Sequence, residues 1–344
     1  MKTKQDIDWD NLGFNALETR SMFIANCDSS GKWVNIGLTP YGEISLSPAS
    51  TVLNYGQGVF EGTKAYMSSK DRVVFFRLEE NAKRFNASCR RLCIPDIPHD
   101  LFISAVKKTV LDNLDYVPQK EKGSLYIRPL ALGTGPMLGV KPSDSYTFVV
   151  FVTPVGSYFK NGLKRLNALV TDKYHRIATK SIGFAKAIGN YSGTLLPFKE
   201  TIEAGYDEII FLNASNENIL DEARSANIFV LKNKTLTTPS VQGSILPGIT
   251  RDSVLKIAEK VFDLDVREQD VTIEELMNAD EVFFTGTAVV VAPVGSICYN
   301  DKTVNFEISY SESMTKNIRE SLINIQNENI RDPFGWVMPA DSIS

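Results

Sequence analysis

The chain has 344 residues, of which 43% are hydrophobic and 23% charged, and its 37 basic and 41 acidic residues give a net charge of −4. This length is typical of two domains, and the composition excludes disordered, fibrous and membrane-embedded proteins. The weak negative charge provides no general attraction to nucleic acid or to an anionic membrane, so we expect neither as a partner.

The first half of the chain predicts short strands followed by helices and a buried strand pair. Alternating apolar residues predict strands at 20–26, 33–37 and 43–46, and a hairpin of 63–67 with 72–76. Helical spacing of apolar residues follows over 78–92 and about 100–114, and two nearly continuous β-rich runs occupy 124–132 and 145–153. These elements predict a small N-terminal domain over residues 1–153.

Residues 154–162 combine proline, glycine and aromatic residues, which indicates an interdomain loop before a larger domain over 163–344. The second half predicts strands at 164–170, 208–212, 227–231, 281–285 and 288–298, and helices at about 190–204, 250–262, 272–278 and 308–327. Thr272 and Glu275 form a capping-box pattern at one helix start. The predicted fold class is α+β.

Histidine and cysteine are scarce. Only His99 and His175 are present, which excludes a His-rich zinc site and leaves a hydrolase only if one of them is the base, so we expect no metal. The four cysteines form no CxxC pair, which favours a reducing compartment. The N-terminal residues MKTKQDIDWD resemble neither a signal nor a transit peptide, so we expect a cytoplasmic protein.

Two motifs favour a structural role. Gly133, Gly135 and Gly139 have the spacing GxGxxxG, but proline follows instead of an apolar helix, so a turn is favoured over a dinucleotide site. Cys89 and Cys93 stand four apart on a predicted helix and could share a ligand or oxidise. With no other Cys or His nearby, a buried helix face is the favoured interpretation.

Three segments leave a structural and a functional interpretation open. Pro247 and Gly248 precede a helix whose first N–H groups could bind a phosphate or simply begin the helix. The run 285–287 (Thr-Gly-Thr) could let an anion approach the backbone or form a plain bulge. Lys186, among small and apolar residues, could be a nucleophilic amine or a lysine that extends its ammonium to water.

Taken together, six segments resemble the branched-chain amino-acid aminotransferases, class IV enzymes that use pyridoxal 5′-phosphate (PLP) and have fold type IV. The resemblance extends over roughly residues 10 to 328 and implies a two-domain α+β enzyme with a smaller N-terminal α/β domain and a larger C-terminal mixed-sheet domain. The segments are YGQGVFEGTKAY (55–66), SLYIRP (124–129), KAIGNY (186–191), DEARSANIF (221–229), ILPGITR (245–251) and FFTGTA (283–288).

The resemblance implies roles for cofactor-binding residues. Lys186 is the residue that carries PLP as a lysine aldimine and moves the proton in catalysis, and Glu222 pairs with the pyridine nitrogen. Tyr191 bonds the phenolic oxygen. The remaining implied contacts are to the phosphate, from Arg84, Ile249, Thr250 and Thr287. Arg84 must then point inward, whereas an arginine on such a helix would otherwise be a surface residue.

The resemblance also implies a pocket for both an aliphatic and an acidic side chain. The aromatic positions are matched by Phe14, Tyr55, Phe60 and Tyr158. The α-carboxylate is held by Tyr126, Thr287 and Ala288. Arg128 binds the side-chain carboxylate of glutamate or 2-oxoglutarate. The implied reaction is ping-pong transfer of the amino group between leucine, isoleucine or valine and 2-oxoglutarate, in a homodimer.

Other functions of the same fold remain as alternatives, and some positions of this chain differ from the family pattern. D-amino-acid transaminase and aminodeoxychorismate lyase share the fold, and a PLP-binding protein without turnover is a further alternative. Arg224 and Ser225 stand where many relatives have a small residue and threonine, which could alter substrate choice. Val289 and Ala292 replace the CxxC pair of some mammalian members, so we expect no thiol switch there.

Overall fold

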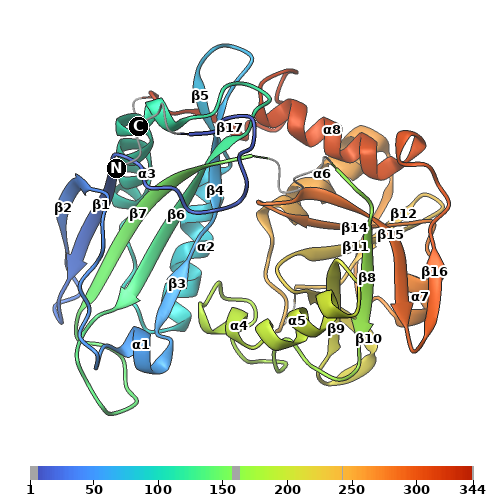
Figure 1. The fold of residues 1–344 in the computed structure, drawn as a ribbon, viewed down its shortest axis with the longest axis horizontal. Coiled ribbons are helices and arrows are strands. Elements are labelled where there is room, and N and C mark those ends of the chain that lie inside the picture. The colour runs from blue at the N-terminus through green and yellow to red at the C-terminus, as the bar shows by residue number, and fades with distance from the viewer. Residues whose placement is uncertain (1–6, 157–162, 242, 343–344) are drawn as a thin grey trace. The chain divides into compact units, whose positions relative to one another are not determined.

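The computed structural model describes residues 7–156, 163–241 and 243–342, and chain contacts divide it into two compact units (Figure 1). The first unit contains Met1–Lys160, Ala185–Gly189 and Asn324–Ser344, and the second contains Asn161–Phe184 and Asn190–Ile323. The predicted division at 154–162 leaves residues 185–189 and 324–344 in the C-terminal half, whereas their contacts place them in the first unit.

The first unit is an antiparallel sheet with two helices on one face. The sheet order is β17-β5-β4-β6-β7-β1-β2, with β3 paired to β6. Its elements are β1 (Ser21–Cys27), β2 (Trp33–Pro40), α1 (Thr51–Tyr55), β3 (Gly58–Phe60), β4 (Thr63–Met67), β5 (Val73–Phe76), α2 (Leu78–Arg91), α3 (His99–Asp112), the short 3-10 helix η2 (Leu114–Tyr116), β6 (Ser124–Gly133), β7 (Tyr146–Val155) and β17 (Val337–Pro339).

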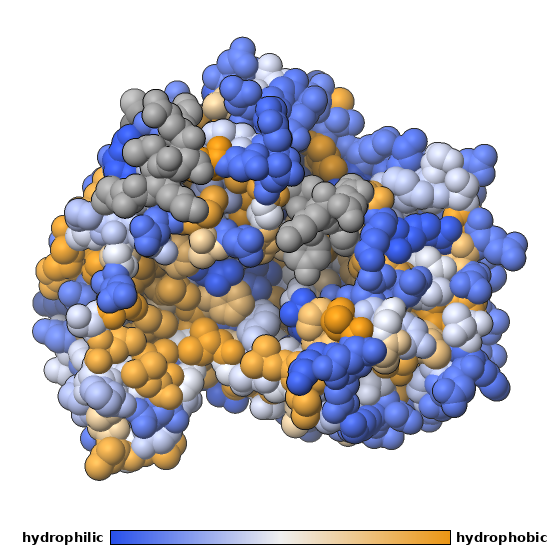
Figure 2. Space-filling model, viewed as in Figure 1, coloured by the Kyte–Doolittle hydropathy of each residue, from blue (hydrophilic) through white to orange (hydrophobic). Residues whose placement is uncertain are grey.

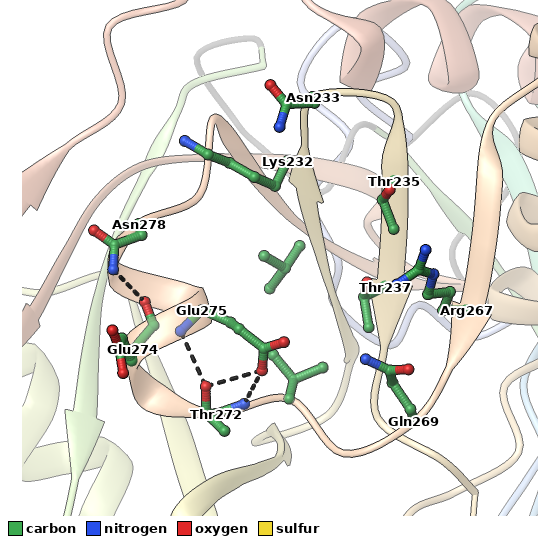
Figure 3. Close-up of a pocket in the computed structure, with 12 residues that line it drawn as sticks. Lys232, Asn233, Thr235, Thr237, Arg267, Gln269, Thr272, Glu274, Glu275 and Asn278 are labelled. Atoms are coloured by element: carbon green, nitrogen blue, oxygen red, sulfur yellow. Dashed lines mark hydrogen bonds between the residues drawn. The ribbon is translucent and has the colours of Figure 1, made fainter.

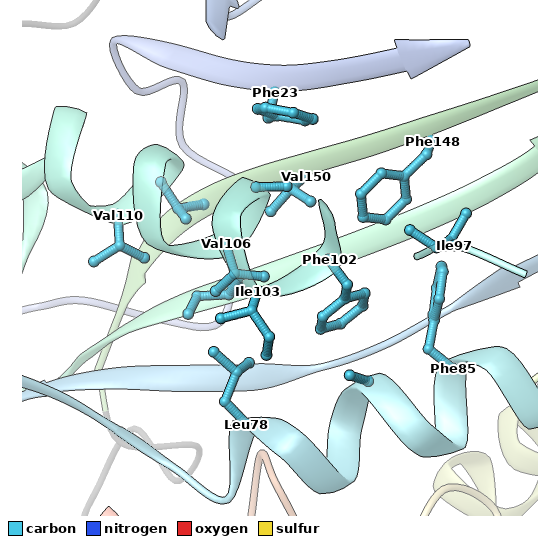
Figure 4. Packing of buried hydrophobic residues seen from close by; sticks show 14 of the residues in the cluster. Phe23, Leu78, Phe85, Ile97, Phe102, Ile103, Val106, Val110, Phe148 and Val150 are labelled. Carbon is cyan, nitrogen blue, oxygen red and sulfur yellow. The ribbon is translucent and has the colours of Figure 1, made fainter. Parts of the chain in front are cut away.

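Helix α2 follows directly from the apolar spacing of its sequence. Leu78, Ala82, Phe85 and Cys89 recur every three or four residues and are all buried. Figure 4 shows the side chains of α2 and α3 meeting those of β1 and β7 in one core, where the rings of Phe85 and Phe148 lie 5.7 Å apart. Burial of one such ring contributes roughly 1.5–3 kcal/mol, so this packing fixes the position of α2 on the sheet.

The second unit is a mixed sheet with helices. The sheet order is β10-β9-β8-β15-β14-β11-β12-β13, with β16 paired to β15, and β8 runs parallel to both β9 and β15. Its elements are β8 (Leu166–Thr171), α4 (Gly189–Ser192), α5 (Leu195–Glu203), β9 (Glu208–Asn213), β10 (Asn216–Ala223), β11 (Asn227–Lys232), β12 (Thr235–Thr238), α6 (Ile249–Phe262), β13 (Asp265–Glu268), α7 (Ile273–Met277), β14 (Glu281–Gly286), β15 (Val290–Tyr299), β16 (Lys302–Asn305), η3 (Tyr310–Glu312) and α8 (Met314–Gln326).

Most predicted elements, the capping box at Thr272 and the α+β class are confirmed. The predicted strand at 43–46 is wrong, because that segment has no ladder partner and forms no strand. The single helix predicted over 190–204 is two, α4 and α5, with a break after Ser192. None of the helices in the described part of the chain combines the length and apolarity needed to cross a bilayer.

Candidate active site

In the first unit, the backbone of Lys186 is held from two sides. Its N–H donates to Ser88 Oγ on α2 at 2.9 Å, and its carbonyl accepts from the N–H of Phe60 on β3 at 3.1 Å. Val59 and Ala187 form a β-bridge beside it. The Lys186 Nζ lies 4.7 Å from the centre of the Phe60 ring. The lysine is therefore held against a helix and a strand, as a reactive amine requires.

Arg84, one turn before Ser88 on α2, packs against a buried carboxylate, and its side chain is 9% exposed. Its Nε and Nη2 donate to Glu61 Oε1 and Oε2 at 2.6 and 2.9 Å, and Glu61 also accepts from Asn81 Nδ2 and the Gly62 N–H, each at 2.9 Å. Burial opposes ionisation of Glu61, but the adjacent guanidinium of Arg84 and the charge of Lys186 hold the pKa of Glu61 below its ordinary value. Arg84 thus points inward, held by a charged partner.

Arg128 points from β6 toward the rings of Phe60 and Tyr126. The Arg128 guanidinium lies 4.7 Å from the centre of the Phe60 ring, and its Nη2 donates to the Tyr126 hydroxyl at 3.2 Å. The Arg128 Nε is buried and has no hydrogen-bond partner among the described residues. Phe14 packs edge-on against Tyr126 at 5.1 Å. The structure therefore brings four predicted substrate residues, Phe14, Phe60, Tyr126 and Arg128, together.

Position 62, directly after Glu61, has no room for a side chain. A Cβ at this position would collide with the Tyr126 hydroxyl. The glycine lets Tyr126 lie directly on the backbone of the same segment that supplies Glu61.

Two predicted aromatic residues are not part of this cluster. Tyr55 ends α1, is 40% exposed, and bonds the carbonyl of Leu138 rather than any residue near Lys186. Tyr158 lies outside the described residues.

In the second unit, Glu222 is buried at the end of β10 with three donors around its carboxylate. Oε1 accepts from the Leu246 N–H at 3.1 Å and lies 2.7 Å from Arg176 Nη2, while Oε2 accepts from Asn227 Nδ2 at 3.0 Å. Hydrogen bonds and a cation favour the charged form of a carboxylate. A carboxylate fixed by these donors is suited to bind a protonated ring nitrogen.

Arg176 bridges Glu222 to a second buried carboxylate. Its Nε lies 3.5 Å from Asp221 Oδ2, and its Nη2 also bonds the carbonyl of Ser244. Burial raises the pKa of Asp221, against the opposing charge of Arg176. Arg176 is therefore shared between two carboxylates and fixes the orientation of Glu222.

The remaining predicted site residues lie at three places in the second unit. Ile249 and Thr250 begin α6, where helix N–H groups and the helix dipole favour an anion. A Cβ at the preceding Gly248 would collide with Asn227 Oδ1, so α6 starts close to the Glu222 partner. Thr287 and Ala288 occupy the turn between β14 and β15. Tyr191 lies on α4, where Thr194 Oγ1 bonds its carbonyl at 2.8 Å.

The two departures from the family pattern differ in their surroundings. Arg224 stacks on Phe198, with its guanidinium carbon 3.7 Å from the ring centre, and its Nε lies 3.8 Å from Glu208 Oε1. Burial raises the pKa of Glu208, which the charge of Arg224 partly offsets. Ser225 is exposed. The long Arg224 side chain is therefore accommodated by partners of its own on α5 and β9.

Other titratable groups lie apart from these residues. His99 pairs with Glu79 and His175 with Glu217, each on the surface. Cys89 is buried on α2, whereas Cys93 is exposed beyond the helix end, so the two cysteines do not share a buried face as predicted. The described residues contain no group of three His, Cys, Asp or Glu side chains that could hold a metal.

A pocket of about 370 Å³ opens elsewhere in the second unit, between β11, β12 and α7 (Figure 3). It is lined by polar residues that include Lys232, Thr237 and Arg267, and the capping box of Thr272 and Glu275 forms one wall. None of the predicted site residues lines it.

Four residues that position the site are not identified by sequence reasoning: Glu61, Ser88, Arg176 and Asn227. Glu61 gave a signal, because it is a lone carboxylate between predicted strands within the motif YGQGVFEG. Arg176 lies in the irregular segment after β8, where no periodicity marks it.

The donor set of each unit, taken by itself, fits PLP. The first unit supplies an amine for the aldehyde carbon and an inward-pointing guanidinium. The second supplies a buried carboxylate for the ring nitrogen and a helix start for the phosphate.

Comparison with known proteins identifies the class. The amino-transferase class IV family matches residues 58–297. The chain therefore belongs to the class IV aminotransferases, PLP-dependent enzymes with this α+β fold.

Individual relatives narrow the family. Branched-chain-amino-acid aminotransferase 2 of Arabidopsis thaliana is 44% identical over 332 residues, covering 96% of this chain and 85% of the relative. Branched-chain-amino-acid transaminase 1 of Bacillus subtilis is 38% identical, covering 97% and 96%. The solved branched-chain amino acid aminotransferase of Escherichia coli has a TM-score of 0.80 at 29% identity, covering 94% of this chain and 100% of that chain. Within its class, the chain belongs to the branched-chain amino acid aminotransferases.

The same comparison corrects the expected location. The Arabidopsis relative is chloroplastic by name, and a hop relative that is 41% identical is mitochondrial. The prediction of a cytoplasmic protein is therefore contradicted. It depended on the cysteine pattern, the N-terminal residues and the lack of a long apolar run, none of which determines the compartment.

Proposed function

We propose that the protein transfers the amino group between leucine, isoleucine or valine and 2-oxoglutarate by a ping-pong reaction. The observation that carries the proposal is the setting of Lys186, whose amine lies over the Phe60 ring and whose charge helps to lower the pKa of the buried Glu61, the partner of Arg84. The buried carboxylate of Glu222, with its three donors, supports it independently.

Each cofactor-binding residue is proposed to act on one part of PLP. When bound, PLP supplies an electron sink for the negative charge that develops at the substrate Cα. Lys186 bonds the cofactor and moves the proton from Cα, and Glu222 holds a proton at the ring nitrogen. Tyr191 donates to the phenolic oxygen. The phosphate is held by Arg84, Ile249, Thr250 and Thr287.

The substrate pocket is proposed to accept two kinds of side chain. Phe14 and Phe60 contact the aliphatic group, while Tyr126, Thr287 and Ala288 hold the α-carboxylate. Arg128 meets the second carboxylate of glutamate or 2-oxoglutarate. Its support is the buried Nε and the stacking on Phe60, which place a cation at the edge of an apolar surface.

A solved relative has been captured with ligands of both kinds. It is a branched-chain amino acid aminotransferase, 29% identical to this chain in one structure and 28% in another. The first holds N-(5′-phosphopyridoxyl)-L-glutamate and the second 4-methylvaleric acid, so that enzyme binds an acidic and an aliphatic side chain. This pair of ligands supports the same dual capacity in the present chain.

A substrate panel with 2-oxoglutarate as the shared acceptor tests this function. We expect kcat/KM to be highest for L-leucine, L-isoleucine and L-valine, and low for D-alanine. Preference for D-alanine would assign the chain to the D-amino-acid transaminases of the same fold. If the protein bound PLP but turned over no substrate, it would be a PLP-binding protein without enzymatic activity.

We expect the Arg128→Ala substitution to lower the activity with glutamate more than the activity with leucine. Hydrogen bonds to charged groups contribute about 1.5–3 kcal/mol, so kcat/KM for glutamate should fall roughly 10- to 100-fold while that for leucine changes little. Steady-state kinetics with both donors measure this, and Arg20→Ala, an exposed arginine paired with Asp115, is the control. Equal losses for the two donors would remove the proposed role.

We further propose a homodimer. Leu138 and Val140, in the loop after β6, are each 85% exposed, and Leu53 on α1 is 60% exposed. Figure 2 shows hydrophobic surface over this lower-left part of the first unit. Such a patch is typical of a protein interface. Light scattering should give twice the mass of one chain, and a Leu138→Asp variant should shift the protein toward the monomer.

A further inference from the structure

The turn between β14 and β15 contains an unfavourable backbone conformation. The turn residues Thr287, Ala288 and Val289 connect Gly286 to Val290, which pair across the hairpin. Val290 has φ of 63°. A β-branched residue rarely adopts this left-handed conformation, because its Cβ substituents meet the backbone. Surrounding contacts must therefore impose it.

Arg319 on α8 makes those contacts. Its Nη1 donates to the carbonyl of Val289 at 2.9 Å and to that of Val291 at 2.5 Å, so it bonds the residues on both sides of Val290. Partial burial lowers the pKa of Arg319, yet a guanidinium stays protonated at neutral pH. Charged donors make stronger hydrogen bonds than neutral ones, which suits Arg319 to impose the conformation.

Helix α8 is itself fixed to the same hairpin. Glu281, the first residue of β14, accepts from the N–H groups of Met314 and Thr315 at 2.8 and 2.9 Å and from Thr315 Oγ1 at 2.6 Å. A carboxylate at a helix start satisfies N–H groups that the helix leaves open and complements its dipole. Arg319 follows Thr315 by one turn, so α8 cannot shift without moving the turn of the hairpin.

We propose that Arg319 is a positioning residue that holds Val290 in its left-handed conformation and thereby sets the backbone of Thr287 and Ala288 for binding the substrate carboxylate. This inference rests on the carboxylate-binding role given to those two residues under the proposed function. Arg319 acts through the carbonyls of Val289 and Val291 and not by touching the substrate.

The experiment compares Arg319→Met, Arg319→Lys, Val290→Gly and the double variant Val290→Gly/Arg319→Met as holoenzymes. Hydrogen exchange of peptides spanning residues 284–291 reports on the turn, and the Kd of 4-methylvaleric acid reports on carboxylate binding. We expect Arg319→Met to speed exchange and to weaken binding roughly tenfold or more, the loss expected for hydrogen bonds from a charged group. Arg319→Lys should retain most of the affinity.

The double variant separates positioning from general stability. Glycine adopts a positive φ at no steric cost, so the loss caused by Arg319→Met should be several-fold smaller when residue 290 is glycine. Lys316→Met, which removes a lysine of α8 that pairs with Glu320, is the matched control and should change neither readout. Equal losses in both backgrounds would overturn the proposal, and Arg319→Lys and Val290→Gly keep it testable should Arg319→Met not fold.

The two readouts distinguish this inference from the function on which it rests. Unchanged exchange in Arg319→Met would show that Arg319 does not hold the turn, and the inference would be wrong. Faster exchange with an unchanged Kd would show that Thr287 and Ala288 do not bind the carboxylate, which overturns both their proposed role and the positioning of substrate by Arg319.

Discussion

The Lys186→Ala protein should no longer retain its cofactor covalently and should lose nearly all transaminase activity. The side chain is the amine near the Glu61–Arg84 pair to which we assign both bonding of PLP and proton transfer. General acid–base catalysis alone contributes about 10²–10⁴-fold, so kcat should fall by at least that factor. Neither histidine is placed to take over the proton transfer, since His99 and His175 lie on the surface in contact with Glu79 and Glu217.

Borohydride reduction gives a readout independent of turnover. In the native enzyme it should fix the cofactor to the peptide that contains residue 186, which mass spectrometry detects, whereas the Lys186→Ala variant should carry no added mass. Lys199→Ala, an exposed lysine on α5, is the control and should retain both the adduct and the activity. An adduct on another lysine, or activity near the native level in Lys186→Ala, would show that the lysine is misassigned.

The Glu61→Gln variant should be strongly destabilised. Glu61 is fully buried and accepts two hydrogen bonds from Arg84 and one each from Asn81 and Gly62. Removing one member of a buried ion pair leaves the other charge without its partner and typically costs about 3–5 kcal/mol. Urea denaturation at neutral pH should therefore show a fall of that order in the free energy of unfolding. Glu80→Gln, which removes a partly exposed carboxylate of α2, should change it by less than about 0.5 kcal/mol.

The same variant has a defined pH dependence. Because the folded protein lowers the pKa of Glu61, its charge stabilises the fold above the ordinary pKa of about 4.3 and this contribution is lost as the pH falls through the lowered value. The stability difference between the native protein and Glu61→Gln should thus be constant near neutrality and narrow in acid. A difference that widened below about pH 4, the ordinary range of a glutamate, would contradict the lowered pKa.

Elements with a strong internal pattern could be predicted from the sequence, and elements that depend on a distant partner could not. Helix α2 and the pair β6 and β7 follow from apolar spacing within each segment. Strand β10 was missed because its first residues, Asn-Glu-Asn, are exposed and polar, although its last four are buried. The short strand β12 was missed because it is defined by its pairing with β11 and β13.

The candidate site shows the same limit. Lys186, Glu222 and Arg84 could be predicted as site residues, because each lies in a distinctive segment of sequence. The partners that fix them come from elsewhere in the chain: Ser88 is 98 residues from Lys186, and Leu246 is 24 residues from Glu222. The pattern within a single segment does not indicate which distant residue will contact it.

The membership of residues 185–189 and 324–344 in the first unit has a consequence for biosynthesis. The sheet of that unit has β17 at one edge, paired with β5, although more than 250 residues of chain separate the two strands. Domains of a nascent chain generally fold as they emerge, but this unit stays incomplete until Val337–Pro339 has left the ribosome. A fragment cut after residue 160 would lack both the edge strand and the lysine, so we expect the amino-terminal half to fail as a self-sufficient module.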